Sequence, residues 1–228
     1  MIEIKHPGLR RALCIIIPFV LIPAAVLAGS FISNGRGHLL IALLVASLAL
    51  LLFVAGFERR QIGTRRMVIV SVMIALSVAG RFIPLFKPIT ALTVITAIYL
   101  GGEAGFLVGS LSALLSNFYF GQGPWTPFQM LAWGMIGIIA GFLSASLRRS
   151  RVLLLCFGVL SGFLYSALMD VWTVIWYADG FHPSAYLAAI LTALPHTALY
   201  AASDFAFLFL LAKPFGEKLS RIKLKYGV

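Results

Sequence analysis

The stretch Ile89 to Asn117, ITALTVITAIYLGGEAGFLVGSLSALLSN, decides how many helices this chain contains. The triplet Gly101-Gly102-Glu103 divides it into an apolar run of about 12 residues and another of about 15. Each run is short for a helix that crosses a membrane, which needs about 20 apolar residues. The stretch is therefore either one interrupted span or two short ones.

The rest of the chain is apolar enough to lie in a bilayer. Of its 228 residues, 61% are hydrophobic and only 11% are charged, with a mean hydropathy of +1.01, whereas soluble domains carry roughly 25% charged residues. Further apolar runs lie at about 12–32, 39–57, 67–83, 128–147, 152–176 and 185–212. We therefore expect an all-α, multi-pass protein of the cytoplasmic membrane without a soluble domain.

The 18 basic residues decide between one span and two at 89–117, because cytoplasmic loops collect Lys and Arg. With two spans and a cytoplasmic N-terminus, 15 basic residues lie inside and only Arg36, Arg81 and Lys87 lie outside. With one span, seven lie inside and 11 outside. We therefore expect eight spans with both termini in the cytoplasm. Residues 1–64 form an N-terminal two-helix hairpin with a basic linker, and residues 65–228 form a six-helix core with a basic tail.

Several classes of function lack support in the sequence. The net charge of +11 collects at the ends of apolar runs, which indicates topology signals and anionic lipid rather than nucleic acid. Cys14 and Cys156 lie inside apolar runs without metal-ligand spacing, so we expect no metal site. The chain has neither a P-loop for ATP nor a catalytic motif. We expect no enzyme activity and no cofactor of its own, so uphill transport needs a gradient or a partner ATPase.

A polar and aromatic island, NFYFGQGPWTPFQMLAW at Asn117–Trp133, falls on the outer side by this count. Tyr, Trp, Gly and Pro also mark ordinary interfacial turns. This island, however, is dense in side chains that hydrogen-bond or stack, which favours a ligand site. The hydrogen-bonding candidates are Asn117, Gln122 and Gln129, and the stacking or apolar candidates are Tyr119, Phe120, Trp125 and Trp133.

Ionisable groups inside membrane spans are costly and therefore mark further candidates. His196, Tyr200 and Asp204 recur every four residues, so we expect them to share an interior helix face. Asp204 is far from the outer side and is expected to make a structural hydrogen bond. Asp170, His196 and Tyr200, with Lys87 from an outer loop, are second-rank ligand candidates. Alternatively, Asp170, His196 and Asp204 carry protons in a secondary transporter.

Small residues at helical spacing predict close helix contacts. Ser71, Ala75 and Ala79 lie on one face of the span at 67–83 and allow close packing, either within this chain or with a partner. Two GxxxG pairs predict packing inside the protein: Gly105 with Gly109, and Gly137 with Gly141.

From about residue 65 to 213 the chain resembles the substrate-binding subunit, or S component, of energy-coupling factor (ECF) vitamin transporters. The resemblance rests on the six core spans, the AxxxA pair Ala75 and Ala79, and the segment Phe86 to Gly105. Its most specific part is SNFYFGQGPWTPFQM at 116–130, followed by AWG at 132–134, which is similar to S components for cobalamin or related corrinoids. The hairpin at about 12–57 lies outside the usual six-helix core.

The resemblance implies a division of labour. The chain would bind a vitamin, cobalamin or a related corrinoid, at the outer face through the island. It would dock through Ser71, Ala75 and Ala79 on a transmembrane coupling subunit that carries two cytosolic ATPases, and topple in the membrane as they use ATP. Alternatives are another vitamin or small metabolite, such as pantothenate or a queuosine precursor, and the proton-coupled secondary transporter.

Overall fold

The computed structural model describes residues 12–13, 15–30, 37–56, 63–178 and 181–226, and over these residues its regular structure is entirely helical. In chain order the elements are the π-helical turn η1 (Ile17–Leu21), α2 (Ile22–Ser30), α3 (Gly37–Gly56), α4 (Gly63–Gly80), α5 (Ile89–Leu100), α6 (Gly102–Phe120), α7 (Thr126–Phe142), α8 (Ser144–Arg149), α9 (Arg151–Tyr177) and α10 (Pro183–Tyr226). The all-α fold expected from the sequence is confirmed.

Helices α5 and α6 are separate helices rather than one interrupted helix. Gly101, between them, has a φ of 100°, a conformation that favours glycine. Helix α5 has only 12 residues, and all of them except Tyr99 are buried. It packs against α4, α6, α7 and α10. A helix too short to cross a bilayer is thus enclosed by protein, where its ends find partners other than lipid.

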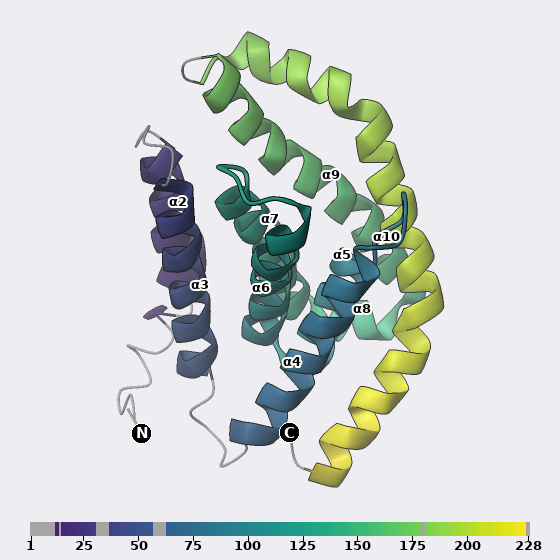
Figure 1. Ribbon diagram of the computed structural model, residues 1–228. Helices are drawn as coiled ribbons and strands as arrows, with labels where there is room; N and C mark the ends of the chain where they lie inside the picture. The colour runs from purple at the N-terminus through teal and green to yellow at the C-terminus, as the bar shows by residue number, and fades with distance from the viewer. Residues whose placement is uncertain (1–11, 14, 31–36, 57–62, 179–180, 227–228) are drawn as a thin grey trace.

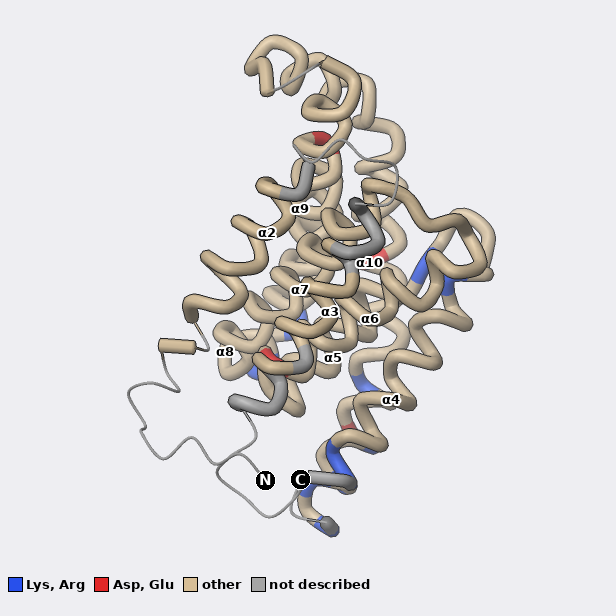
Figure 2. The backbone as a smooth tube through the Cα atoms, turned by 60° about the vertical axis from the view of Figure 1, so that its left-hand side comes forward, with Lys and Arg blue, Asp and Glu red and all other residues tan. Residues whose placement is uncertain are grey.

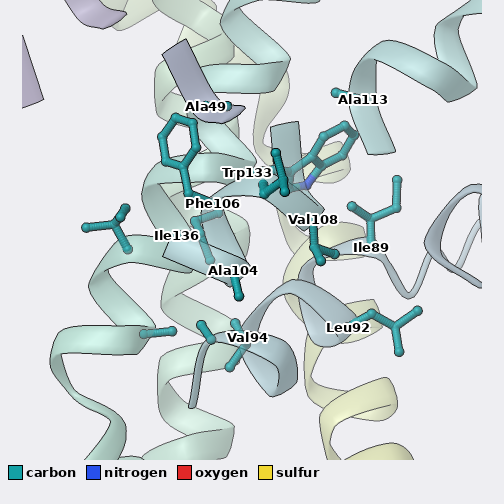
Figure 3. Close-up of a cluster of buried hydrophobic side chains, with 14 of the residues drawn as sticks. Ala49, Ile89, Leu92, Val94, Ala104, Phe106, Val108, Ala113, Trp133 and Ile136 are labelled. Carbon is teal, nitrogen blue, oxygen red and sulfur yellow. The ribbon is translucent and has the colours of Figure 1, made fainter. Parts of the chain in front are cut away.

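The central contact of the fold is the pair α6 and α7, which approach through glycine. A Cβ atom added to Gly137 would lie 2.5 Å from the carbonyl carbon of Gly105, and one added to Gly109 would lie 2.6 Å from the carbonyl carbon of Trp133. The glycine pairs therefore mark packing inside the protein, as predicted. Figure 3 shows the apolar core beside this contact, with Phe106 of α6 and Ile136 of α7, both fully buried.

The N-terminal hairpin packs on the α6–α7 side of the core. Helix α3 contacts α6 and α7, and α2 contacts α7. Ala49 of α3 is fully buried near the ring of Phe106 (Figure 3), and Phe19 stacks on Phe142 at a centroid distance of 6.2 Å. Helix α4 lies away from this hairpin, across the front of the bundle in Figure 1. The hairpin and α4 therefore occupy different sides of the core.

The C-terminal helices depart from the expected spans. Among the described residues, α9 and α10 are the helices long and apolar enough to cross a membrane by themselves. Helix α10 contains Pro195 and Pro214 and bends near its upper end (Figure 1). It runs on to residue 226, so the basic tail expected after residue 212 is helical. The span expected at 128–147 divides into α7 and α8, because Leu143 leaves the helical conformation with φ −88° and ψ 7°.

Lys and Arg residues lie near both ends of α4 (Figure 2). At one end, Arg66 donates to the last carbonyl of α5, the Lys223 ammonium donates to the Tyr99 carbonyl at 3.3 Å, and the Arg148 guanidinium lies 5.0 Å from the Tyr99 ring centroid. The connection between α4 and α5, residues 81–88, lies at the other end. This arrangement agrees with two crossings at 89–117, and the number of membrane crossings stays a prediction. Which end faces the cytoplasm stays a prediction.

Candidate ligand-binding site

A cavity lies beneath the connection between α4 and α5, at the end of the bundle that the charge count places outside. Its volume is about 40 Å³, enough for about three water molecules. The connection, the start of α5, and helices α7, α9 and α10 all contribute to its wall. The lining residues are Arg81, Lys87, Ile89, Thr90, Gln129, Trp133, Tyr165, Tyr200 and Asp204.

Aromatic side chains from three helices form one side of the cavity. The rings of Trp133 and Tyr165 are stacked, with centroids 4.6 Å apart and an interplanar angle of 19°. Tyr200 meets Tyr165 edge to face at 5.1 Å. The Arg81 guanidinium lies 5.7 Å from the Trp133 ring centroid. Each side chain is held by the next, so the wall presents rigid aromatic surface to a bound molecule.

A chain of hydrogen bonds behind this wall fixes its polar groups. Asn117 is fully buried and accepts from Arg81 Nη1 through Oδ1 at 2.5 Å. Its Nδ2 donates to Gln129 Oε1 at 2.8 Å and to Thr126 Oγ1 at 2.9 Å. Gln129 Nε2 in turn donates to the Tyr165 hydroxyl at 3.2 Å. Because the side-chain amides of Asn117 and Gln129 both make hydrogen bonds, they hold Arg81 and Gln129 at the cavity in defined orientations.

Residues 81–88 contribute Arg81 and Lys87 to the cavity wall and are fastened to α10. The Lys87 N–H donates to Ser203 Oγ at 2.8 Å, and the Ser203 hydroxyl donates back to the Lys87 carbonyl at 3.1 Å. Burial and the neighbouring Arg81 both lower the pKa of the Lys87 ammonium, burial more strongly. Leu85 has a φ of 64°, a left-handed conformation that costs a non-glycine residue roughly 1–2 kcal/mol. Residues 81–88 are thus strained at Leu85 and anchored to Ser203 by two hydrogen bonds.

The predicted site residues fall into three groups. The cavity brings together four of them, namely Lys87, Gln129, Trp133 and Tyr200. Asn117 lies behind the cavity and orients its wall. The third group, Tyr119, Phe120, Gln122, Trp125, Asp170 and His196, is not part of the lining.

Tyr119 and Phe120, two members of the third group, pack against the segment 81–88. The Phe82 ring lies 4.7 Å from that of Tyr119 and 5.0 Å from that of Phe120, and the Arg81 guanidinium lies 4.9 Å from the Phe120 centroid. Tyr119 is 73% exposed. The side chains of Tyr119 and Phe120 therefore form an aromatic rim beside the cavity.

Two further members shape the loop between α6 and α7. Gln122 donates to the Leu114 carbonyl at 2.9 Å and accepts from the Thr126 hydroxyl at 2.9 Å. The Trp125 indole packs on Gly123 and meets Trp172 of α9 edge to face at 5.9 Å. Both side chains stabilise this loop, and so position the start of α7.

The expected interior face of α10 is interrupted at its upper end. Tyr200 and Asp204 reach the cavity, but His196 is exposed, contrary to the interior position that the four-residue spacing predicts. His196 follows Pro195, where the upper part of α10 turns away from the core (Figure 1). Asp170 on α9 is buried but lies outside the cavity lining.

Sequence reasoning missed four residues of the lining, Arg81, Ile89, Thr90 and Tyr165. It gave Asp204 a structural hydrogen bond or, in the alternative transporter, the role of a proton carrier. Asp204 also lines the cavity, with Thr90 near its carboxyl group. Arg81 carried a usable signal, since it is an isolated arginine at the end of an apolar helix. Tyr165 lies in a uniformly apolar run, and nothing in that run separates it from an ordinary core aromatic. Among the described residues, no group of three or more His, Cys, Asp or Glu side chains is placed to hold a metal ion.

Comparison with known proteins identifies the family. Residues 61–213, more than half of the chain, match the model of the family described as ECF-type riboflavin transporter, S component. A UPF0397 protein of Aliivibrio salmonicida (strain LFI1238) is 30% identical over 115 residues, which cover 50% of this chain and 60% of that relative. No solved structure matches the chain. The chain belongs to the family of ECF-type riboflavin transporter S components, which are membrane transport subunits and not enzymes.

Proposed function

We propose that this chain is the substrate-binding membrane subunit of an ECF-type ABC transporter, and that it binds a vitamin-sized organic molecule in the cavity beneath residues 81–88. Its partners in this role are a transmembrane coupling subunit and two cytosolic ATPases, which use ATP for uptake. The chain itself binds and delivers the ligand.

The observation that carries this proposal is the composition of the cavity. Small-molecule sites combine apolar and aromatic surface with a few convergent polar groups. Here the stacked pair Trp133 and Tyr165 supplies the aromatic surface, and Gln129, Thr90 and Lys87 supply polar groups. The site lies at the end of the bundle that the charge count predicts to face outside, where solutes arrive.

The small volume of the cavity indicates how a ligand is admitted. Space for about three water molecules is too small for any vitamin, so the cavity must widen on binding, and we propose that residues 81–88 move outward. The exposed apolar side chains of this segment, Phe82, Ile83, Leu85 and Phe86, can then pack on the ligand or on the rim. A corrinoid demands a larger displacement than riboflavin, and the rim of Tyr119 and Phe120 would contact its periphery.

The exposed face of α4 supports docking to a coupling subunit. Ser71, Ala75 and Ala79 are all exposed, whereas Met73 and Ser77 of the same helix face the core. The small residues are therefore not used for packing within this chain. A flat, small-residue stripe on a membrane helix allows a partner helix to approach closely, and we propose that the coupling subunit occupies it.

The proton-coupled alternative finds less support. It requires Asp170, His196 and Asp204 to lie along one path. His196 is exposed, and only Asp204 of the three reaches the cavity. Uptake into vesicles that lack every ATPase would favour this alternative over an S component.

We expect purified chain in detergent to bind one member of a vitamin panel saturably, with quenching of tryptophan fluorescence. The panel contains riboflavin, cobalamin, cobinamide, pantothenate and nicotinate. Trp133→Leu should weaken the binding about five- to tenfold, because an aromatic contact contributes roughly 0.5–1.5 kcal/mol beyond buried area. Trp176→Leu, an exposed tryptophan outside the lining, is the matched control. Failure of every panel member to bind would overturn the proposed function.

A further inference from the structure

We infer that the ligand carries an anionic group, a carboxylate or a phosphate, and that Lys87 and Arg81 bind this group. The inference rests on the proposed function, and it names the chemical class of the molecule that this site takes. It is independent of the scaffold, since a flavin phosphate, a corrinoid acid and pantothenate all present such a group.

The first observation is that two cations of one short segment line one small cavity. Arg81 and Lys87 both belong to the connection between α4 and α5, and both are partly buried. Each loses part of its hydration there, and the two positive charges are near enough to repel each other. Such an arrangement is costly unless an opposite charge joins it.

The second observation is that the protein does not supply that opposite charge. Arg81 donates to neutral oxygens, Ser116 Oγ and Asn117 Oδ1, while its Nε is buried without a hydrogen-bond partner. Among the described residues, neither Arg81 nor Lys87 forms an ion pair with a carboxylate. Asp204, the acid of the lining, is 3% exposed and lies near Thr90. Even with Asp204 ionised, the lining keeps a net positive charge.

The third observation is the direction of α5. Its first residues, Ile89 and Thr90, line the same cavity, and its N-cap residue, Pro88, makes no side-chain cap. A helix N-terminus carries a partial positive charge and free N–H groups, which favour an anion. The helix end therefore adds to the field of the two cations instead of opposing it.

The test compares acids with neutral analogues on the same scaffold. The pairs are riboflavin 5′-phosphate with riboflavin, cobyric acid with cobinamide, pantothenate with pantothenol, and nicotinate with nicotinamide. Each compound is titrated into the purified full chain at pH 7. In at least one pair, the acid should bind about tenfold or more tightly than its neutral analogue, as expected for a hydrogen bond between charged groups.

Lys87→Gln should reduce this preference to less than about threefold, and Lys87→Arg should keep most of it, since the positive charge is retained. Lys87 is the better probe because its side chain, unlike that of Arg81, does not hold Ser116 and Asn117. Circular dichroism and thermal melting of Lys87→Gln show whether the fold is intact. Lys213→Gln, an exposed lysine of α10, is the control for loss of charge.

The outcomes separate this inference from the proposed function. Preferential binding of a neutral member, or an acid preference that Lys87→Gln leaves unchanged, overturns the inference and leaves small-molecule binding standing. If no compound of either kind binds, the proposed function fails and the inference falls with it.

Discussion

The double variant Ala75→Leu/Ala79→Leu is expected to lose ATP-driven uptake and to keep ligand binding. Both alanines are exposed on α4, and this helix lies on a different side of the core from the N-terminal hairpin. Two leucine side chains would hold a partner helix away from the α4 backbone, and close approach is what small-residue faces provide in membranes. The cavity involves none of α4 itself, only the connection that follows it. Binding and uptake should therefore separate.

Uptake is measured in proteoliposomes that contain the complete transporter, and binding is measured on the isolated chain. Ala198→Leu/Ala202→Leu is a matched control, because these alanines have the same spacing and are also exposed, on α10. The control should transport normally. Normal uptake by the α4 variant would show that the coupling subunit docks elsewhere, and equal loss in both variants would show that added bulk in the membrane is harmful in general.

Gly137→Leu is expected to prevent folding, and Gly137→Ala to destabilise the chain by at least about 3 kcal/mol, the upper range for overpacked cores. A Cβ atom at this position would lie 2.5 Å from the Gly105 carbonyl carbon and 2.7 Å from the Phe106 nitrogen. Both are backbone atoms of α6, so relief requires the two central helices to separate. That separation would also disturb the wall of the cavity, since α7 carries Gln129 and Trp133.

Unfolding in detergent, followed by circular dichroism or thermal melting, measures the effect. Ala202→Leu adds bulk at an exposed helix position and should change stability by less than about 0.5 kcal/mol. A Gly137→Ala variant as stable as the unchanged chain would contradict the close contact between α6 and α7.

The sequence predicted the features that depend on local chemistry. The two glycines at 101 and 102 divide the stretch that follows Pro88 into two helices, as the short apolar runs required. The glycine pairs of α6 and α7 lie at a helix contact, and spacing alone indicated this. The division of the expected span 128–147 into α7 and α8 has a different origin, because hydropathy continues through Leu143 while the backbone leaves the helical conformation there.

The site itself was only partly predictable, because its partners are distant in the chain. Arg81 meets Ser116 and Asn117, 35 and 36 residues away, and Lys87 meets Ser203 across 116 residues. No local pattern encodes such pairs. The composition of the island at 117–133 also did not show which of its aromatic residues line the cavity. Trp133 lies inside the cavity and Tyr119 outside it, although both looked equally suited to stacking.

The central claim is that the space beneath residues 81–88 holds the ligand. A structure of the chain with its tightest-binding panel member tests this claim most directly. We expect the ligand between Trp133, Gln129 and Tyr200, with its anionic group at Lys87 and with residues 81–88 displaced outward. A ligand bound only on the outer rim at Tyr119 and Phe120, with the cavity as small as it is here, would contradict the claim.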